Sequence, residues 1–219
     1  MLSTSEENHL KAIYSITLDQ EKGASTNSIA KKLSTKASSV TDMIKKLADK
    51  GLVSYQPYQG SKLTGTGQTA ALKVIRKHRL WETFLFNKLG FSWDEVHEVA
   101  EQLEHVQSPK LTERLDAFLD FPAFDPHGDP IPDASGNFSQ RDPEVVLAEM
   151  AVGDQGKVTK IKDSSEEFLR FCQQHGIVIG ANFTVKDKYG YDATMELTIG
   201  SKSVIISEKI SLQICAKEL

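Results

Sequence analysis

The first third of the chain carries a helix-turn-helix pattern followed by a hairpin pattern, and this order restricts the fold more than any other feature. Ser3 and Thr4, followed by Glu6 and Glu7, offer capping-box starts for a first helix. Apolar residues recur at helical spacing over three segments, about Thr4–Leu18, Thr26–Leu33 and Ser38–Lys50. Two short runs then predict a β-hairpin, Leu52–Tyr55 and Lys62–Thr64. We therefore expect a winged helix-turn-helix.

The polar face of the third helix is suited to nucleic acid. Small hydroxyls near a helix N-terminus can approach bases and phosphates, and lysines further along suit phosphates. Such a helix can lie in a DNA major groove. The candidate DNA contacts are Thr35, Ser38, Ser39, Thr41, Asp42, Lys45 and Lys46, joined by Tyr58 and Lys62 from the hairpin. A small helical bundle with a solvated face is the alternative, but the order of elements favours DNA binding.

Charge is divided unevenly along the chain. Residues 1–80 carry 13 Lys and Arg against 6 Asp and Glu, whereas residues 81–219 carry 13 against 24. A basic first third and an acidic remainder suggest one segment for phosphates and another for cations. Chance clustering explains such an asymmetry equally well, so the interpretation depends on the motifs.

Two sets of histidine and glutamate residues recur at helical spacing. The first holds His97, Glu101, Glu104 and His105, and the second holds His78 and Glu82. On a helix, the members of each set share one stripe, and together they predict a site for a divalent cation. Without the cation we expect unfavourable self-repulsion in this cluster. A charged, solvated helix face is the alternative for an isolated stripe, but two stripes beside a winged helix favour a metal.

The remainder of the chain predicts further helices and then a small β-domain. Helices are expected over about Gln68–Leu89, from Trp93 to before Pro109, and over Lys110–Leu119. Their apolar excess predicts a homodimer interface. A Pro- and Gly-rich loop follows over Phe121–Asn137, and we assign its His127 no role.

Short alternating runs begin at about Ala148, and one helix, about Ser165–His175, interrupts them. They predict a small β-barrel of five strands, over Gly156–Ile161, Asn182–Lys188, Thr194–Ile199, Ser203–Ile206 and Leu212–Cys215. The expected fold class is mainly α with β. The expected domains are a winged helix over 1–72, a helical domain over 73–137, a linker over 138–150 and the barrel over 151–219.

Several classes of protein are disfavoured by the sequence. No apolar stretch is long enough for a membrane span, and the polar Met1–Glu7 is not a signal peptide. Cys172 and Cys215 are too few for a disulfide framework, so a cytoplasmic location fits best. No nucleophile-plus-base constellation appears, so we expect no enzyme and no organic substrate. A metalloenzyme and a winged-helix regulator that senses an organic ligand are the rival interpretations.

The sequence resembles the iron- and manganese-dependent repressors typified by the diphtheria toxin repressor and the manganese transport regulator. The motifs that carry the resemblance span Glu6–Tyr14, Ser38–Leu47, Leu63–Gly67, Lys77–Glu82, Val96–His105 and His127–Pro132. The resemblance implies a winged helix, a helical dimerisation domain and a C-terminal SH3-like, FeoA-like domain. It also implies a dimer that binds Mn(II) or Fe(II), recognises palindromic double-stranded operators and represses metal-uptake genes.

The resemblance also implies two ligand sets. The primary set is Asn8, Glu101, Glu104 and His105, and the ancillary set is His78, Glu82 and His97, with weaker additions from Ser164 and Glu167. Lys11 stands where two-domain manganese members have a ligating Glu, so their binuclear geometry is not implied here. Glu101 stands where iron-type members have Cys. An oxygen and nitrogen shell suits Mn(II), which we favour over the alternative, Fe(II).

Overall fold

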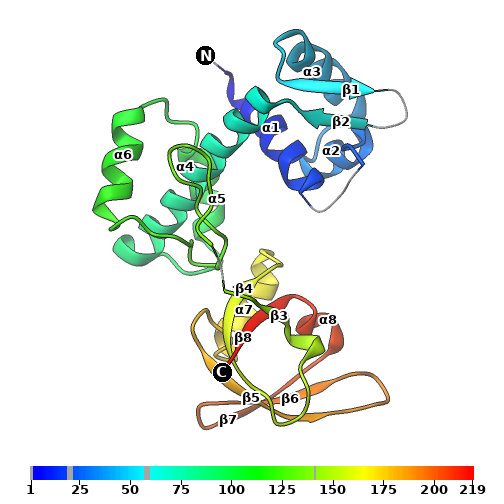
Figure 1. Ribbon diagram of the computed structural model, residues 1–219, viewed down its shortest axis with the longest axis vertical. Coiled ribbons are helices and arrows are strands. Elements are labelled where there is room, and N and C mark those ends of the chain that lie inside the picture. Colours follow the sequence, from blue (N-terminus) through cyan, green and yellow to red (C-terminus); the bar gives the residue numbers. More distant parts are fainter. Residues whose placement is uncertain (1, 19–21, 57–59, 141) are drawn as a thin grey trace. The chain divides into compact units, whose positions relative to one another are not determined.

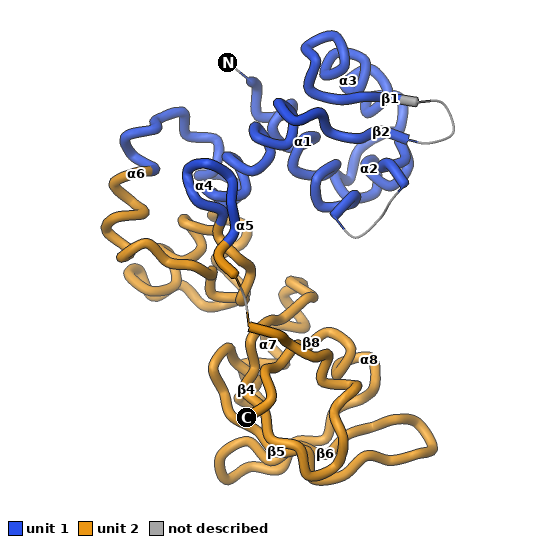
Figure 2. Tube along the Cα trace, in the orientation of Figure 1, with its two compact units in different colours: residues 1–78, 101–112, 132–138 blue, residues 79–100, 113–131, 139–219 orange. Residues whose placement is uncertain are grey.

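The computed structural model describes residues 2–18, 22–56, 60–140 and 142–219. The chain forms two compact units, shown in Figure 2. Unit 1 comprises residues 1–78, 101–112 and 132–138, and unit 2 comprises residues 79–100, 113–131 and 139–219. Three helices, α4, α5 and α6, contribute residues to both units.

The N-terminal part of unit 1 is the predicted winged helix (Figure 1). Its elements are α1 (Thr4–Thr17), α2 (Thr26–Lys32), α3 (Ala37–Asp49), β1 (Val53–Gln56), β2 (Gly60–Leu63) and the start of α4 (Gly65–Leu89). The two strands are antiparallel, with Val53 opposite Leu63. Leu10, Ile13, Ile29 and Leu47 are fully buried in its core. The α-helical periodicity of the sequence therefore placed these helices within a few residues of their observed ends.

Local residue chemistry fixes the boundaries of these elements. Ser3 and Glu6 form the predicted capping box at the start of α1. Ser34 in the turn before α3 has φ 49°, and Gly51 after α3 has φ 70°. Gly67 is required by close packing, since a Cβ there would lie 1.9 Å from the Leu52 carbonyl oxygen. The first turn of α4 can approach the wing only with glycine at this position.

The middle of the chain contributes α5 (Val96–Leu103) and α6 (Pro109–Phe118). Unit 2 has a small core here, formed by Leu80, Leu115 and Ile131. The predicted fifth helix was too long, because Glu104 and His105 lie in a turn after Leu103. Within the described residues, no helix combines the length and the apolar character that a membrane span requires.

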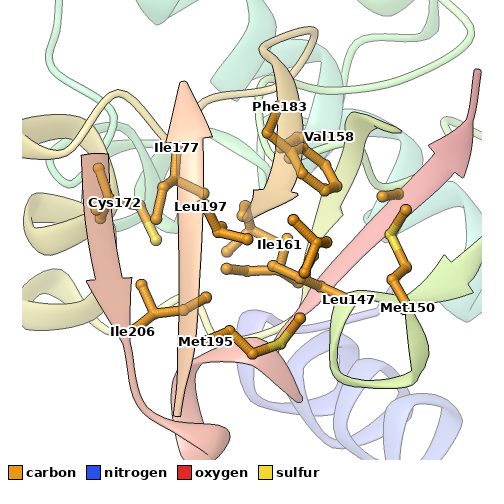
Figure 3. Close-up of a cluster of buried hydrophobic side chains, with 14 of the residues drawn as sticks. Leu147, Met150, Val158, Ile161, Cys172, Ile177, Phe183, Met195, Leu197 and Ile206 are labelled. Atoms are coloured by element: carbon orange, nitrogen blue, oxygen red, sulfur yellow. The ribbon is translucent and has the colours of Figure 1, made fainter. Parts of the chain in front are cut away.

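The C-terminal part of unit 2 is an antiparallel sheet with strand order β3-β8-β4-β5-β6-β7. Its strands are β3 (Val145–Val146), β4 (Gln155–Ile161), β5 (Asn182–Lys188), β6 (Met195–Ile199), β7 (Lys202–Ile206) and β8 (Ile214–Glu218). The helical elements of this part are η1 (Leu147–Glu149), α7 (Glu166–Gln174) and α8 (Glu208–Ser211). Figure 3 shows the apolar side chains of these elements meeting in one core.

The five predicted strands and α7 are present, whereas β3, η1 and α8 were missed. Both Leu147 and Met150 are nevertheless core residues. The predicted fold class is confirmed: a winged helix, a helical part and a C-terminal β-sheet part.

Candidate metal centre

Glu104 is the centre of a buried cluster in unit 1. Its side chain is only 1% exposed, and its Oε2 lies 2.6 Å from Nδ1 of His78 on α4. Lys11 on α1 donates to both carboxylate oxygens, each at 2.8 Å from Nζ. One carboxylate thus joins three segments that are far apart in the sequence.

Glu7 and His105 extend this cluster. His105 Nδ1 lies 2.6 Å from Oε2 of Glu7, and His105 Nε2 lies 3.5 Å from Oε1 of Glu104. Gln107 donates to Glu7 Oε1 at 2.8 Å. Glu7 was not predicted as a site residue. In the sequence, Glu7 stands four residues before Lys11, which puts both on one face of α1.

The other two predicted primary residues are Glu101 on α5 and Asn8 on α1, both in unit 1. Lys11 Nζ is 3.6 Å from Oε1 of Glu101, whose side chain is 53% exposed. Asn8 follows Glu7 on α1, and its Oδ1 is buried without a hydrogen-bond partner. The amide of Asn8, the carboxylates and the imidazoles of unit 1 are donor types that suit a hard or borderline divalent cation. The residues present therefore fit a metal.

Positive side chains balance the charge of this cluster. Burial raises the pKa of Glu104, but the hydrogen bond with His78 and the charge of Lys11 more than offset it, so the pKa lies below its usual value. Lys77 adds a further cation 3.9 Å from Glu7. The predicted self-repulsion of a metal-free cluster is therefore wrong for unit 1, because lysines of α1 and α4 lie among the carboxylates.

Unit 2 has its own acidic cluster around Glu82. His97 Nδ1 lies 3.1 Å from Glu82 Oε1, so these two residues of the predicted ancillary set are together. Glu82, Asp125 and His127 each offer a ligand atom within 4.8 Å of the others. The loop containing Asp125 and His127 was expected, but sequence reasoning missed both as site residues.

The loop that carries these two residues is held firmly. His127 stacks on Trp93 with ring centroids 5.5 Å apart, and its Nε2 lies 3.1 Å from the Trp93 carbonyl oxygen. Asp125 Oδ1 accepts the backbone N–H groups of His127 and Asp129. Burial, with the charges of Glu82 and Asp129, raises the pKa of Asp125 well above its usual value, and Arg79 opposes this rise only in part.

The remaining ancillary predictions stay predictions. His78 is a residue of unit 1, and Ser164 and Glu167 are exposed residues of unit 2 at the start of α7. Both cysteines are buried in unit 2.

Three family profiles match the chain in order. They are the iron dependent repressor N-terminal DNA binding domain over residues 1–61, the iron dependent repressor metal binding and dimerisation domain over 64–133, and the FeoA domain over 145–218. A solved manganese-dependent transcriptional repressor in complex with manganese is 36% identical, with a TM-score of 0.88 over 98% of this chain and 100% of that chain. The chain belongs to the iron-dependent repressor family.

Curated relatives agree with this assignment. An uncharacterized HTH-type transcriptional regulator of Methanocaldococcus jannaschii is 38% identical over 119 residues, which are 54% of this chain and 95% of that protein. The iron-dependent repressor IdeR of Mycobacterium leprae is 34% identical over 128 residues, 58% of this chain and 54% of IdeR. This family member is a metal-dependent transcriptional repressor and not an enzyme.

The predicted DNA-contacting residues of this repressor lie mainly on the exposed side of α3. Those that are exposed are Thr35, Ser38, Ser39, Thr41, Asp42, Lys45, Lys46 and Lys62, whereas Tyr58 lies outside the described residues. Lys46 is not simply available to phosphates, because its Nζ lies 3.1 Å from Oε1 of Glu6. Lys50 binds the same oxygen at 2.6 Å. Their positive charges lower the pKa of Glu6 to about 2, with the Lys50 hydrogen bond as the largest cause.

Proposed function

We propose that this repressor senses Mn(II) and, as a homodimer, represses metal-uptake genes by binding palindromic operator DNA. The supporting observation is the donor chemistry of unit 1: His78 and His105 lie beside the Glu104 carboxylate, and the Asn8 amide oxygen is buried without a hydrogen-bond partner. Mn(II) prefers such oxygen and nitrogen ligands, and thiolates would favour softer metals. Fe(II) is the alternative metal. A cytoplasmic location and domains over 1–72, 73–137 and 151–219 belong to the same proposal.

Asn8, Glu101, Glu104 and His105 would hold the primary metal. The ancillary set would be Glu82 and His97, to which we add Asp125 and His127 because their ligand atoms group with Glu82. His78 would complete the ancillary set from α4, with weaker additions from Ser164 and Glu167. A bound metal supplies positive charge that these donors then share.

The residues of the primary set come from separate segments of unit 1. Asn8 lies on α1, Glu101 lies on α5, and Glu104 and His105 follow α5. Holding them on one cation would restrict how α1 moves against the segment 101–105, and α1 packs in the winged-helix core. Two recognition helices must lie about 34–36 Å apart to enter successive major grooves. We propose that metal favours this spacing, so operator DNA must in turn tighten metal binding.

The test is operator binding titrated with metal. Palindromic duplexes are first selected from a randomised pool by the Mn(II)-loaded chain, and their anisotropy is then followed with Mn(II), Fe(II) or Zn(II). We expect Glu104→Ala and His105→Ala to abolish the Mn(II)-dependent part of binding, because each removes a donor from the primary set. Glu98→Ala, which removes an exposed carboxylate of α5, is the matched control and should behave as wild type.

The outcomes separate the competing functions. Binding that is equally strong with chelator present would favour a winged-helix regulator of an organic ligand and would contradict the metal proposal. A response to Fe(II) at concentrations where Mn(II) has no effect would replace manganese by iron. Normal Mn(II)-dependent binding by both site variants would show that the primary set is assigned to the wrong residues.

A further inference from the structure

Lys11 places a positive charge among the carboxylates proposed to hold the metal. Its Nζ lies 2.8 Å from both oxygens of Glu104 and 3.6 Å from Oε1 of Glu101. The Lys11 side chain is only 20% exposed, and that of Glu104 is 1% exposed. The oxygens that would bind a divalent cation are therefore engaged by a cation of the chain itself.

The position of Lys11 on α1 also places its ammonium close to the proposed metal. It lies one helical turn after Glu7 and Asn8 on α1, so it shares their face of the helix. A cation held by Asn8, Glu101, Glu104 and His105 would have to lie close to this ammonium. Two positive charges at such a separation repel strongly where water is largely excluded. The ammonium and the metal therefore compete for the same carboxylates.

We infer that Lys11 is a competitor of the metal that is attached to the chain itself. Its ammonium neutralises Glu104 and Glu101 in the metal-free chain and must leave Glu104 when a divalent cation binds. This inference rests on the proposed metal function and adds the residue that sets the metal concentration at which the repressor responds. It also accounts for a buried Glu104 in the absence of metal, since an uncompensated buried carboxylate is strongly unfavourable.

The first experiment compares Mn(II) dissociation constants of full-length wild type, Lys11→Met and Lys11→Arg by isothermal titration calorimetry. Lys11→Met should bind Mn(II) at least about tenfold more tightly, within the range usual for coupled binding events. Lys11→Arg keeps the charge and should stay within about threefold of wild type. The matched control is Lys50→Met, which removes a lysine bound to another α1 carboxylate, Glu6, and should leave the dissociation constant unchanged.

A second readout needs no metal. The midpoint of thermal unfolding of the metal-free chain should fall by about 5 °C in Lys11→Met, because Glu104 loses its main compensating charge. Added Mn(II) should restore more stability to this variant than to wild type. A third readout needs no variant: limited acetylation followed by mass spectrometry should label Lys11 of wild type faster when Mn(II) is present, because the ammonium has left Glu104.

Each result decides between the inference and its failure. Equal or weaker Mn(II) binding by Lys11→Met, with wild type binding Mn(II) normally, would overturn the competitor role and leave the proposed function intact. Acetylation of Lys11 that does not change with Mn(II) would also overturn it, even if Lys11→Met failed to fold. Absence of Mn(II) binding by wild type and Lys50→Met alike would instead contradict the proposed function itself.

Discussion

The acidic clusters of the two units balance their charge in different ways. In unit 1, Lys11 and His78 contact Glu104 directly, and the pKa of this carboxyl group lies below its usual value. In unit 2, burial and the neighbouring carboxylates raise the pKa of Asp125, and Arg79 compensates only in part. Similar ligand residues therefore do not imply similar metal-free states. In unit 1 the Lys11 ammonium lies 2.8 Å from the Glu104 carboxylate, whereas in unit 2 the Arg79 guanidinium lies 3.6 Å from the Asp125 carboxylate.

The largest expected difference between the clusters is in metal-free stability. Glu104→Gln leaves Lys11 and His78 without their charged partner and should lower the free energy of unfolding by about 3 kcal/mol. Asp125→Asn should change it by less than about 1 kcal/mol, because an amide mimics a protonated carboxyl group and still accepts two backbone hydrogen bonds. Urea unfolding of the chelated variants measures both. Equal losses would show that the two clusters are balanced in the same way.

The next difference is in metal stoichiometry. Glu82→Ala should remove the Mn(II) bound by unit 2 and leave that bound by unit 1, since Glu82 is the residue shared by His97, Asp125 and His127. Mn(II) per chain is measured by mass spectrometry after equilibrium dialysis. Glu95→Ala, an exposed carboxylate of the same unit, is the control. Loss of all Mn(II) in Glu82→Ala would mean that the clusters do not bind independently.

A smaller effect is expected where unit 1 balances the Glu6 carboxylate with two lysines at the end of α3. Glu6→Gln releases Lys46 and Lys50 from their common partner. The salt dependence of DNA binding should steepen by up to about two units of slope, since each freed lysine gains about 0.9 unit on contacting a phosphate. Fluorescence anisotropy between low and moderate salt measures the slope. An unchanged slope would indicate that neither lysine reaches the DNA.

The smallest expected effect concerns the reactivity of the Cys172 thiol, because neither proposed ligand cluster includes a cysteine. Burial, aided by the charge of Asp163, raises the pKa of Cys172 to about 12, so its thiolate is scarce at neutral pH. Alkylation of the native protein by iodoacetamide at pH 7.5 should be slow and should not change with Mn(II). Protection by Mn(II) would add a thiol to the ligand set and weaken the preference for manganese.

Features set by local chemistry were predictable from the sequence. The capping residues of α1 and the positive-φ Gly51 after α3 mark helix boundaries within a few neighbouring residues. The strands with alternating burial, such as β5, were equally recognisable. In contrast, β3 has only two residues and no pattern of its own, and it forms by pairing with β8.

The contacts of the site were not predictable, because they depend on distant segments. Lys11 and Glu104 are 93 residues apart, and Glu7 and His105 are 98 residues apart. Helical spacing suggested that Glu104 and His105 continue the stripe of α5, but the helix ends at Leu103 and both residues lie in the following turn. His127 was assigned no role from the sequence, because its position depends on stacking against the distant Trp93.

Glu6 and Glu7 are adjacent on α1 but have different partners: Glu6 binds Lys46 of α3 and Lys50 just after it, and Glu7 binds His105. Consecutive residues of an α-helix point about 100° apart. Inserting a single amino acid between Ser3 and Glu6 would therefore break the capping box, and inserting one within α1 after Glu7 would swing both carboxylates away from their partners at once. The rotational position of Glu6 and Glu7 on α1 is therefore constrained. This segment should tolerate substitutions more readily than insertions or deletions.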